Sequence, residues 1–152
     1  MPTISYGNYP ERLSDLLGSL GEAERDRARI LTKEENDELE SISLNRLPQT
    51  SWGTIDWNSI NVREQHAVSD DVEGAALLRQ LVLRYAEADS ETIIFWGNIV
   101  VPSLALAVNI VAELTNEILA TSHDVWLFAV KEQIILEYFH EGRLTVADVP
   151  TY

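Results

Sequence analysis

The sequence predicts a single α+β domain with a mainly antiparallel sheet of four or five strands, packed helices and an N-terminal helical segment. Three stretches carry this prediction. Residues 124–146 predict a three-stranded antiparallel meander, because runs rich in β-branched and aromatic residues are separated by turns. Residues 71–88 have apolar side chains at the i, i+3 and i+4 spacing of an amphipathic helix. Residues 92–97, TIIFWG, have the composition of a buried strand.

The first part of the chain, residues 1–90, is expected to be mostly helical. Residues 11–20 form a short helix in this interpretation, with four leucines on one face and Pro10 near the start. Thr32 followed by Glu35 matches a capping box, which predicts a second helix from about Lys33. That helix would show an acidic face made of Glu34, Glu35, Asp37, Glu38 and Glu40. Such a face is more often simply solvated than a partner surface.

A loop-like connection and a polar stretch separate this helix from the long amphipathic helix. The connection holds Trp52 and Trp57, which we expect to be core or lid residues. Residues 61–70 are polar and predict no definite element. At the start of the long helix, Asp70, Asp71 and Glu73 lie where capping and the helix dipole favour negative charge.

Residues 91–152 predict a strand, a helix and the meander. Pro102 fits either a bend before a second strand or the start of the helix, and the helix is clear from Asn109 to about Ala120. Strands as apolar as those of the meander need cover on both faces of the sheet. Trp126 and Tyr138 fall in these apolar runs, and we expect Trp126 to be buried.

Composition restricts the classes of function. The chain has 152 residues, 45% of them hydrophobic, and a net charge of −14 from 25 acidic and 11 basic residues. This charge argues against nucleic-acid binding, which needs a basic surface, and fits a basic protein partner or simple solubility. The absence of cysteine excludes disulfides and thiolate sites and fits the cytosol. We expect no membrane span and no signal peptide, because no apolar run is long enough and the N-terminus lacks a basic region.

No motif in the sequence predicts a catalytic, cofactor-binding or metal site. His66, His123 and His140 form no i, i+4 pair, and no P-loop, dinucleotide-binding or GxSxG motif is present. Acidic residues are abundant, so a small hydrolase that uses carboxylates stays an alternative, as does an acidic adaptor or structural domain. The sequence therefore favours a binding protein over an enzyme.

Two segments resemble the immunity proteins of bacterial contact-dependent growth inhibition systems. One is residues 93–103, IIFWGNIVVPS, with a strand, an FWGN turn and a VPS bend. The other is residues 124–142, where DVWLF leads into IILEYFHEG, and the aliphatic helix between the two segments ends in TSHD. Residues 1–90 carry no motif of that family. The resemblance implies a non-catalytic cytoplasmic inhibitor that binds the C-terminal toxin domain of a surface-delivered effector. Such toxins are often nucleases.

The expected partner is therefore a cognate toxin domain with a basic surface, bound in a 1:1 complex that occludes its active or substrate-binding site. No nucleic acid, membrane or cofactor is expected to bind. Complementary charge accelerates association, so acidic clusters are the candidate contact residues. The candidates are Glu34, Glu35, Asp37 and Glu38 on the early helix, Asp70, Asp71 and Glu73 at the start of the long helix, and His140 and Glu141 at a turn of the meander.

Overall fold

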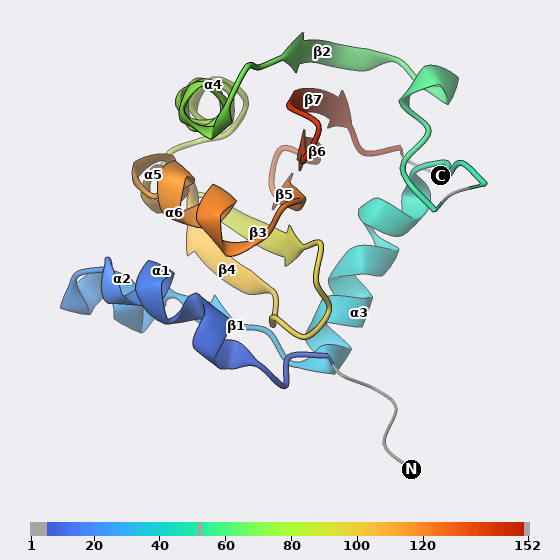
Figure 1. Cartoon of the computed structure of the whole chain (residues 1–152). Helices are drawn as coiled ribbons and strands as arrows, with labels where there is room; N and C mark the ends of the chain where they lie inside the picture. Colours follow the sequence, from blue (N-terminus) through green and yellow to red (C-terminus); the bar gives the residue numbers. More distant parts are fainter. Residues whose placement is uncertain (1–5, 52, 151–152) are drawn as a thin grey trace.

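A seven-stranded sheet with only antiparallel neighbours is the centre of the computed structural model, which describes residues 6–51 and 53–150. The strand order is β1-β4-β3-β5-β6-β7-β2 (Figure 1). The strands are β1 (Arg29–Ile30), β2 (Val62–Ala67), β3 (Glu91–Trp96), β4 (Leu104–Ala107), β5 (Val125–Ala129), β6 (Ile134–Phe139) and β7 (Arg143–Asp148). The α+β class is confirmed.

The sheet is larger than the predicted four or five strands, and both unpredicted strands lie at its edges. β1 has two residues, too few for any sequence pattern. β2 falls in the polar stretch that predicted no definite element, and its residues alternate between half-buried and exposed. An edge strand that is rich in charge is protected against pairing with other chains, which explains why β2 lacks the apolar signature of the inner strands.

The helices cover both faces of the sheet (Figure 1). α4, α5 and α6 lie on one side, and α3 lies on the other with the connection that follows it. The helices are α1 (Ser14–Gly18), α2 (Glu22–Arg27), α3 (Lys33–Ser41), α4 (Asp71–Tyr85), α5 (Val108–Glu113) and α6 (Thr115–Thr121), with 3-10 helices at Pro10–Leu13, Leu44–Arg46 and Trp57–Ser59.

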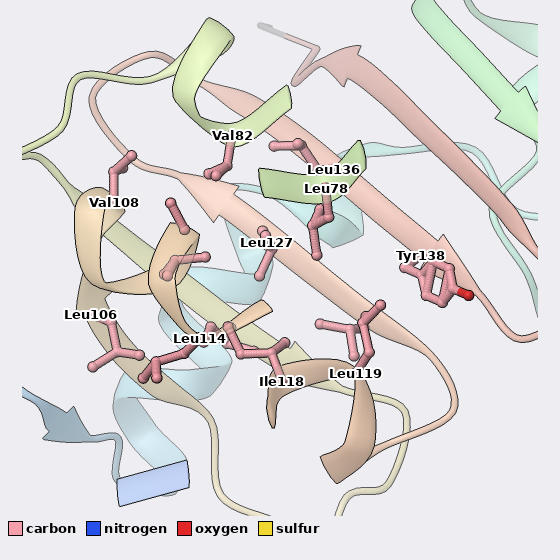
Figure 2. Close-up of a cluster of buried hydrophobic side chains, with 14 of the residues drawn as sticks. Leu78, Val82, Leu106, Val108, Leu114, Ile118, Leu119, Leu127, Leu136 and Tyr138 are labelled. Carbon is pink, nitrogen blue, oxygen red and sulfur yellow. The ribbon is translucent and has the colours of Figure 1, made fainter. Parts of the chain in front are cut away.

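The core on the α4 side is built from aliphatic side chains of alternate strand positions. Figure 2 shows Leu78 and Val82 of α4 close to Leu127 and Leu136 of the two central strands, with Leu114 and other residues of the α5–α6 region below them. Leu78, Val82, Leu127 and Leu136 are at most 1% exposed. Full burial of such a side chain contributes about 1.5–3 kcal/mol, so this face supplies much of the stability.

The opposite face has a smaller core that includes aromatic residues. Phe95, Phe128 and Ile135 point to this side, and Trp57 covers them from the 3-10 helix Trp57–Ser59. Because the side-chain period of a strand is two, residues next to these along each strand face α4 instead. The prediction of cover on both faces is confirmed.

The predicted helices are present, with two differences in their extent. The helix expected at residues 11–20 is a 3-10 turn followed by the short α1. The helix expected at residues 109–120 is divided into α5 and α6 at Leu114, whose φ of −112° and ψ of 21° leave the α conformation. Pro102 precedes β4, so the alternative of a bend before a second strand is the observed one.

The edge strand β2 is attached to the end of α4 through Glu64. The carboxylate of Glu64 accepts hydrogen bonds from the Tyr85 hydroxyl and from Arg84 Nη1, the latter at 2.7 Å. The Tyr85 hydrogen bond, the nearby His66 and the Arg84 charge hold the pKa of Glu64 at about 2. An ion pair between Arg63 and Asp148 joins β2 to β7 as well.

In the described part of the chain, no helix is both long and apolar enough to cross a bilayer.

The contact between α4 and β6 depends on the small size of Gly74. The Tyr138 hydroxyl donates a hydrogen bond to Asp71 Oδ1 at 2.7 Å, and the tyrosine is 4% exposed. A Cβ atom on Gly74 would lie 2.8 Å from the Tyr138 ring, closer than real contacts allow. Glycine at this helical position is therefore required by packing and not by backbone conformation.

Gly74→Ala should destabilise the protein although alanine favours helices by about 1 kcal/mol over glycine. The added methyl group must displace Tyr138 or α4, and such overpacking costs about 1–3 kcal/mol. Gly18→Ala in α1 is the matched control, because no atom lies within 4 Å of its added Cβ. Urea denaturation of both variants measures the difference; a Gly74→Ala protein as stable as Gly18→Ala would contradict the tight contact.

Candidate partner-binding site

A buried glutamate on the inner strand β6 is the most unusual feature of the α3 side of the sheet. Glu137 is 1% exposed, and its carboxylate accepts two indole hydrogen bonds. Trp57 Nε1 donates to Oε1 at 2.8 Å, and Trp126 Nε1 donates to Oε2 at 2.9 Å. Trp126 lies directly opposite Glu137 on β5, and Trp57 arrives from the connection after α3. The carboxylate thus joins the sheet to the segment that covers it.

The electrostatics of Glu137 are dominated by burial. Removal from water raises the pKa of Glu137 above its ordinary value, while the two indole hydrogen bonds and the charge of Arg143 oppose that rise. Arg143 Nη2 lies 3.9 Å from Oε1, too far for a strong hydrogen bond. A buried carboxylate with only this distant cation retains much of its desolvation cost.

An open pocket of about 260 Å³ lies beside this carboxylate, and we call it the Glu137 pocket. It lies between the end of α3, the connection after α3, and strands β5 and β6. Its described lining comprises Glu40, Leu44, Asn45, Gln49, Gly53, Thr54, Ile55, Asp124, Trp126, Glu137 and Phe139. Three of these residues are acidic, and none of the described ones is basic.

The two other acidic residues of the pocket reach it from different elements. Glu40 is at the end of α3, and burial raises its pKa, although a hydrogen bond with Asn36 opposes this rise. Asp124 precedes β5, and its Oδ1 accepts hydrogen bonds from the backbone N–H of His140 at 2.8 Å and from Nδ1 of that residue at 2.9 Å. An ionised carboxylate can only accept, so Nδ1 of His140 carries the proton in this arrangement.

A second pocket, of about 470 Å³, lies on the other side of Asp124. Arg12, His123 and His140 contribute side chains to it. The guanidinium of Arg12 donates to the carbonyl oxygen of Thr121 from Nε and Nη2, both at 3.3 Å. Asp124 therefore separates an acidic pocket from a neighbouring one with basic side chains.

Of α3, only Glu40 is in the described lining of the Glu137 pocket, and two members of the predicted acidic cluster on this helix have local partners. Glu35 completes the predicted capping box with Thr32 and forms an ion pair with Arg29, and Asp37 forms an ion pair with Lys33. Glu34 and Glu38 are exposed and form no ion pair with any described residue. Only these two carboxylates of the cluster are free for a partner.

The second predicted cluster lies on the opposite face of the sheet, and its carboxylates already form hydrogen bonds at the start of α4. Asp70 Oδ1 accepts from the N–H of Glu73 at 2.8 Å, and Glu73 Oε1 accepts from the N–H of Ser69 at 2.8 Å. Asp71 accepts from Tyr138. The interpretation as helix caps is confirmed for Asp70 and Glu73, whereas Asp71 bonds to Tyr138, and the structure does not bring these residues together with the α3 cluster.

The two remaining predicted residues, His140 and Glu141, lie in the turn between β6 and β7. His140 contacts Asp124 and lines the second pocket, whereas Glu141 is exposed. This turn is therefore close to the Glu137 pocket through Asp124 but is not part of its described lining.

The sequence-based candidates missed Glu137, Asp124 and the role of Trp57. The available signal was a single charged residue inside the apolar run IILEYF, because a buried charge needs partners. Trp57 is buried as predicted, and Trp52 lies outside the described residues. The prediction of a buried Trp126 is wrong in part: its indole is only half-buried, because one side of it lines the open pocket.

The described side chains form no group of three or more His, Asp or Glu residues arranged to hold a metal ion. The carboxylates of the Glu137 pocket are fixed by indole, amide and imidazole donors instead. Among these three carboxylates and their described partners, no nucleophilic side chain is paired with a general base in the way that hydrolases require. The arrangement is suited to binding a cationic group.

The fold and the pocket define an acidic α+β protein with a carboxylate-lined surface cavity. Residues 15–147 match the family described as CdiI immunity protein EcoliA0-like. The chain belongs to this family and is an immunity protein of a contact-dependent growth inhibition system. A comparison with curated proteins found no match. The resemblance inferred from the sequence is confirmed, and the match extends it into the N-terminal part.

Trp57→Phe should destabilise the protein more at pH 7 than at pH 5. The change removes one hydrogen bond to Glu137, which for a charged acceptor is worth about 1.5–3 kcal/mol. In the folded state the pKa of Glu137 is raised above the ordinary 4.5 of the unfolded chain. The folded state therefore binds the proton more tightly than the unfolded chain. As the pH falls toward 4.5, Glu137 becomes protonated in the folded protein, and the loss of a hydrogen bond to its ionised form destabilises the variant less.

Trp96→Phe is the matched control for this experiment. Trp96 is similarly buried, at 7% exposed, but its Nε1 donates to a neutral acceptor, the carbonyl oxygen of Pro102, at 2.9 Å. Its loss of stability should be the same at both pH values. Chemical denaturation of the two variants and the parent measures this, and an equal loss for Trp57→Phe at pH 5 and pH 7 would contradict a Glu137 whose protonation changes between these pH values.

Proposed function

We propose that this protein neutralises its cognate toxin domain by binding it in a 1:1 complex in the cytoplasm. It acts as a non-catalytic inhibitor in this proposal, and it protects the cell that makes it. The observation that carries the proposal is membership of the CdiI immunity family over residues 15–147. The toxin domain is the C-terminal domain of the contact-dependent inhibition effector.

The charge of the protein supports a nuclease as the toxin. A nuclease binds a phosphate backbone and needs a basic surface to do so. The net charge of −14 on this chain is complementary to such a surface. An acidic protein that covers it excludes the nucleic acid, so the proposed inhibition is occlusion of the substrate-binding site, with electrostatic steering of association.

The α3 side is the proposed contact surface. Glu34 and Glu38 are exposed, lie one helical turn apart and have no ion pair with a described residue, whereas the carboxylates at the start of α4 cap that helix. The Glu137 pocket continues this surface from the end of α3. Exposed carboxylates without ion pairs to described residues on α3, together with an acidic pocket at the end of that helix, favour this face over the α4 face.

Reversing Glu34 and Glu38 to Lys should weaken toxin binding at least several-fold while the protein stays folded. Exposed substitutions of this kind usually change stability by about 0.5 kcal/mol or less each. The loss should come mainly from slower association, and it should shrink at high salt because salt screens the steering field. Surface plasmon resonance at low and high salt and a growth-protection assay measure these effects.

The double variant Glu22→Lys, Asp26→Lys on α2 is the matched control. These two acidic residues are also exposed, one helical turn apart and without an ion pair to a described residue, so the change of net charge is the same. It should bind and protect nearly as well as the parent. Equal binding by the α3 and α2 variants would place the interface elsewhere, and a parent protein that does not bind the toxin would overturn the proposed function.

A further inference from the structure

We propose that the Glu137 pocket is a receptor for one arginine side chain, presented by the toxin surface. This inference rests on the proposed function for the identity of the partner. The ligand is identified by its chemistry, as a planar cation carried on a methylene stem. The argument uses the charge of the pocket, its walls and the fixed position of its central carboxylate.

The pocket has an excess of negative charge that its own surroundings do not neutralise. Glu40, Asp124 and Glu137 contribute three carboxylates, and the described lining contains no Lys or Arg. Arg143 is outside this lining, with its nearest contact to Glu137 at 3.9 Å, and its guanidinium lies over the ring of Phe139. A cation that enters the pocket therefore meets more negative charge than the protein itself compensates.

The walls of the pocket suit a guanidinium better than a metal ion or an ammonium group. Trp126 supplies an aromatic surface on which a planar guanidinium can stack, while Phe139, whose ring already lies under the Arg143 guanidinium, adds apolar surface to the wall. Leu44 and Ile55 supply aliphatic surface for the methylene stem of an arginine. The volume of about 260 Å³ is below the range of about 300–1,000 Å³ that is typical of pockets for drug-sized ligands, which fits a single side chain.

The carboxylate of Glu137 is fixed before any ligand arrives. Its two oxygens each accept one indole hydrogen bond, from Trp57 and Trp126, and a carboxylate oxygen has capacity for a further donor. A group that is already oriented loses little conformational entropy on binding. Burial raises the pKa of both Glu137 and Glu40, so a bound cation would restore part of the stabilisation that these carboxylates lost with their water.

The indole N–H resonances of Trp57 and Trp126 provide a direct test, because both groups donate to Glu137. The probe is Nα-acetyl-L-arginine amide, whose only charge is the guanidinium, titrated into the ¹⁵N-labelled full chain at constant ionic strength. We expect saturable shifts of both resonances. The neutral analogue Nα-acetyl-L-citrulline amide should give no saturable shift, and neither probe should move the Trp96 indole, which bonds to Pro102.

Two variants with the same change of residue separate the pocket from general charge effects. Asn45→Arg puts a guanidinium at an exposed position of the pocket lining, so it should compete with the probe and weaken its binding at least tenfold. Asn58→Arg adds the same charge at an exposed position outside the described lining and should bind the probe like the parent. Equal binding by Asn45→Arg and Asn58→Arg, or equal shifts with citrulline, would overturn the inference.

The test is independent of the toxin-binding experiment. Flat titrations with the arginine probe, in a protein that still binds and protects against its toxin, would overturn the arginine receptor alone. A protein that binds the probe at Glu137 but does not bind the toxin would confirm the receptor chemistry and overturn the toxin as its source.

Discussion

The hydrogen bonds from two tryptophans to one buried carboxylate determine how the α3 side of this protein is built. Glu137 lies in the middle of the inner strand β6, and burial makes its negative charge costly unless donors are provided. Trp126 provides one from the neighbouring strand, and Trp57 provides the other from the connection after α3. The connection is thereby fixed against the sheet, and the end of α3, with Glu40, lies beside an open pocket.

The two faces of the sheet have different chemistry and different roles. The α4 side is a tightly packed aliphatic core, and the carboxylates at its edge cap a helix or bond to Tyr138. The α3 side has a smaller core, a half-buried tryptophan, and carboxylates that retain acceptor capacity. Asp70, Asp71 and Glu73 are thus engaged in structural hydrogen bonds at one face, whereas Glu34 and Glu38 at the other form no ion pair with a described residue. This asymmetry supports the proposal that the α3 side is the contact surface.

The elements with strong periodic signals could be predicted from the sequence, and those determined by tertiary contacts could not. The amphipathic α4, the capping box of α3 and the three strands of the meander are all present near their predicted bounds. The edge strand β2 was missed because its polar residues carry no burial pattern. The pocket was missed because its residues come from separate segments of the chain. The register of β5 and β6 places Trp126 opposite Glu137, and the connection after α3 folds back so that Trp57 reaches the same carboxylate.

The state of Glu137 is the quantity on which this account depends most directly. A pH titration followed by ¹³C NMR of the Glu137 side-chain carboxyl, together with the indole N–H groups of Trp57 and Trp126, measures it in the folded protein. The account predicts a pKa for Glu137 above the ordinary 4.5, with both indole resonances changing at the same midpoint. A midpoint at or below 4.5, or indoles that do not follow it, would contradict the buried, indole-bound carboxylate.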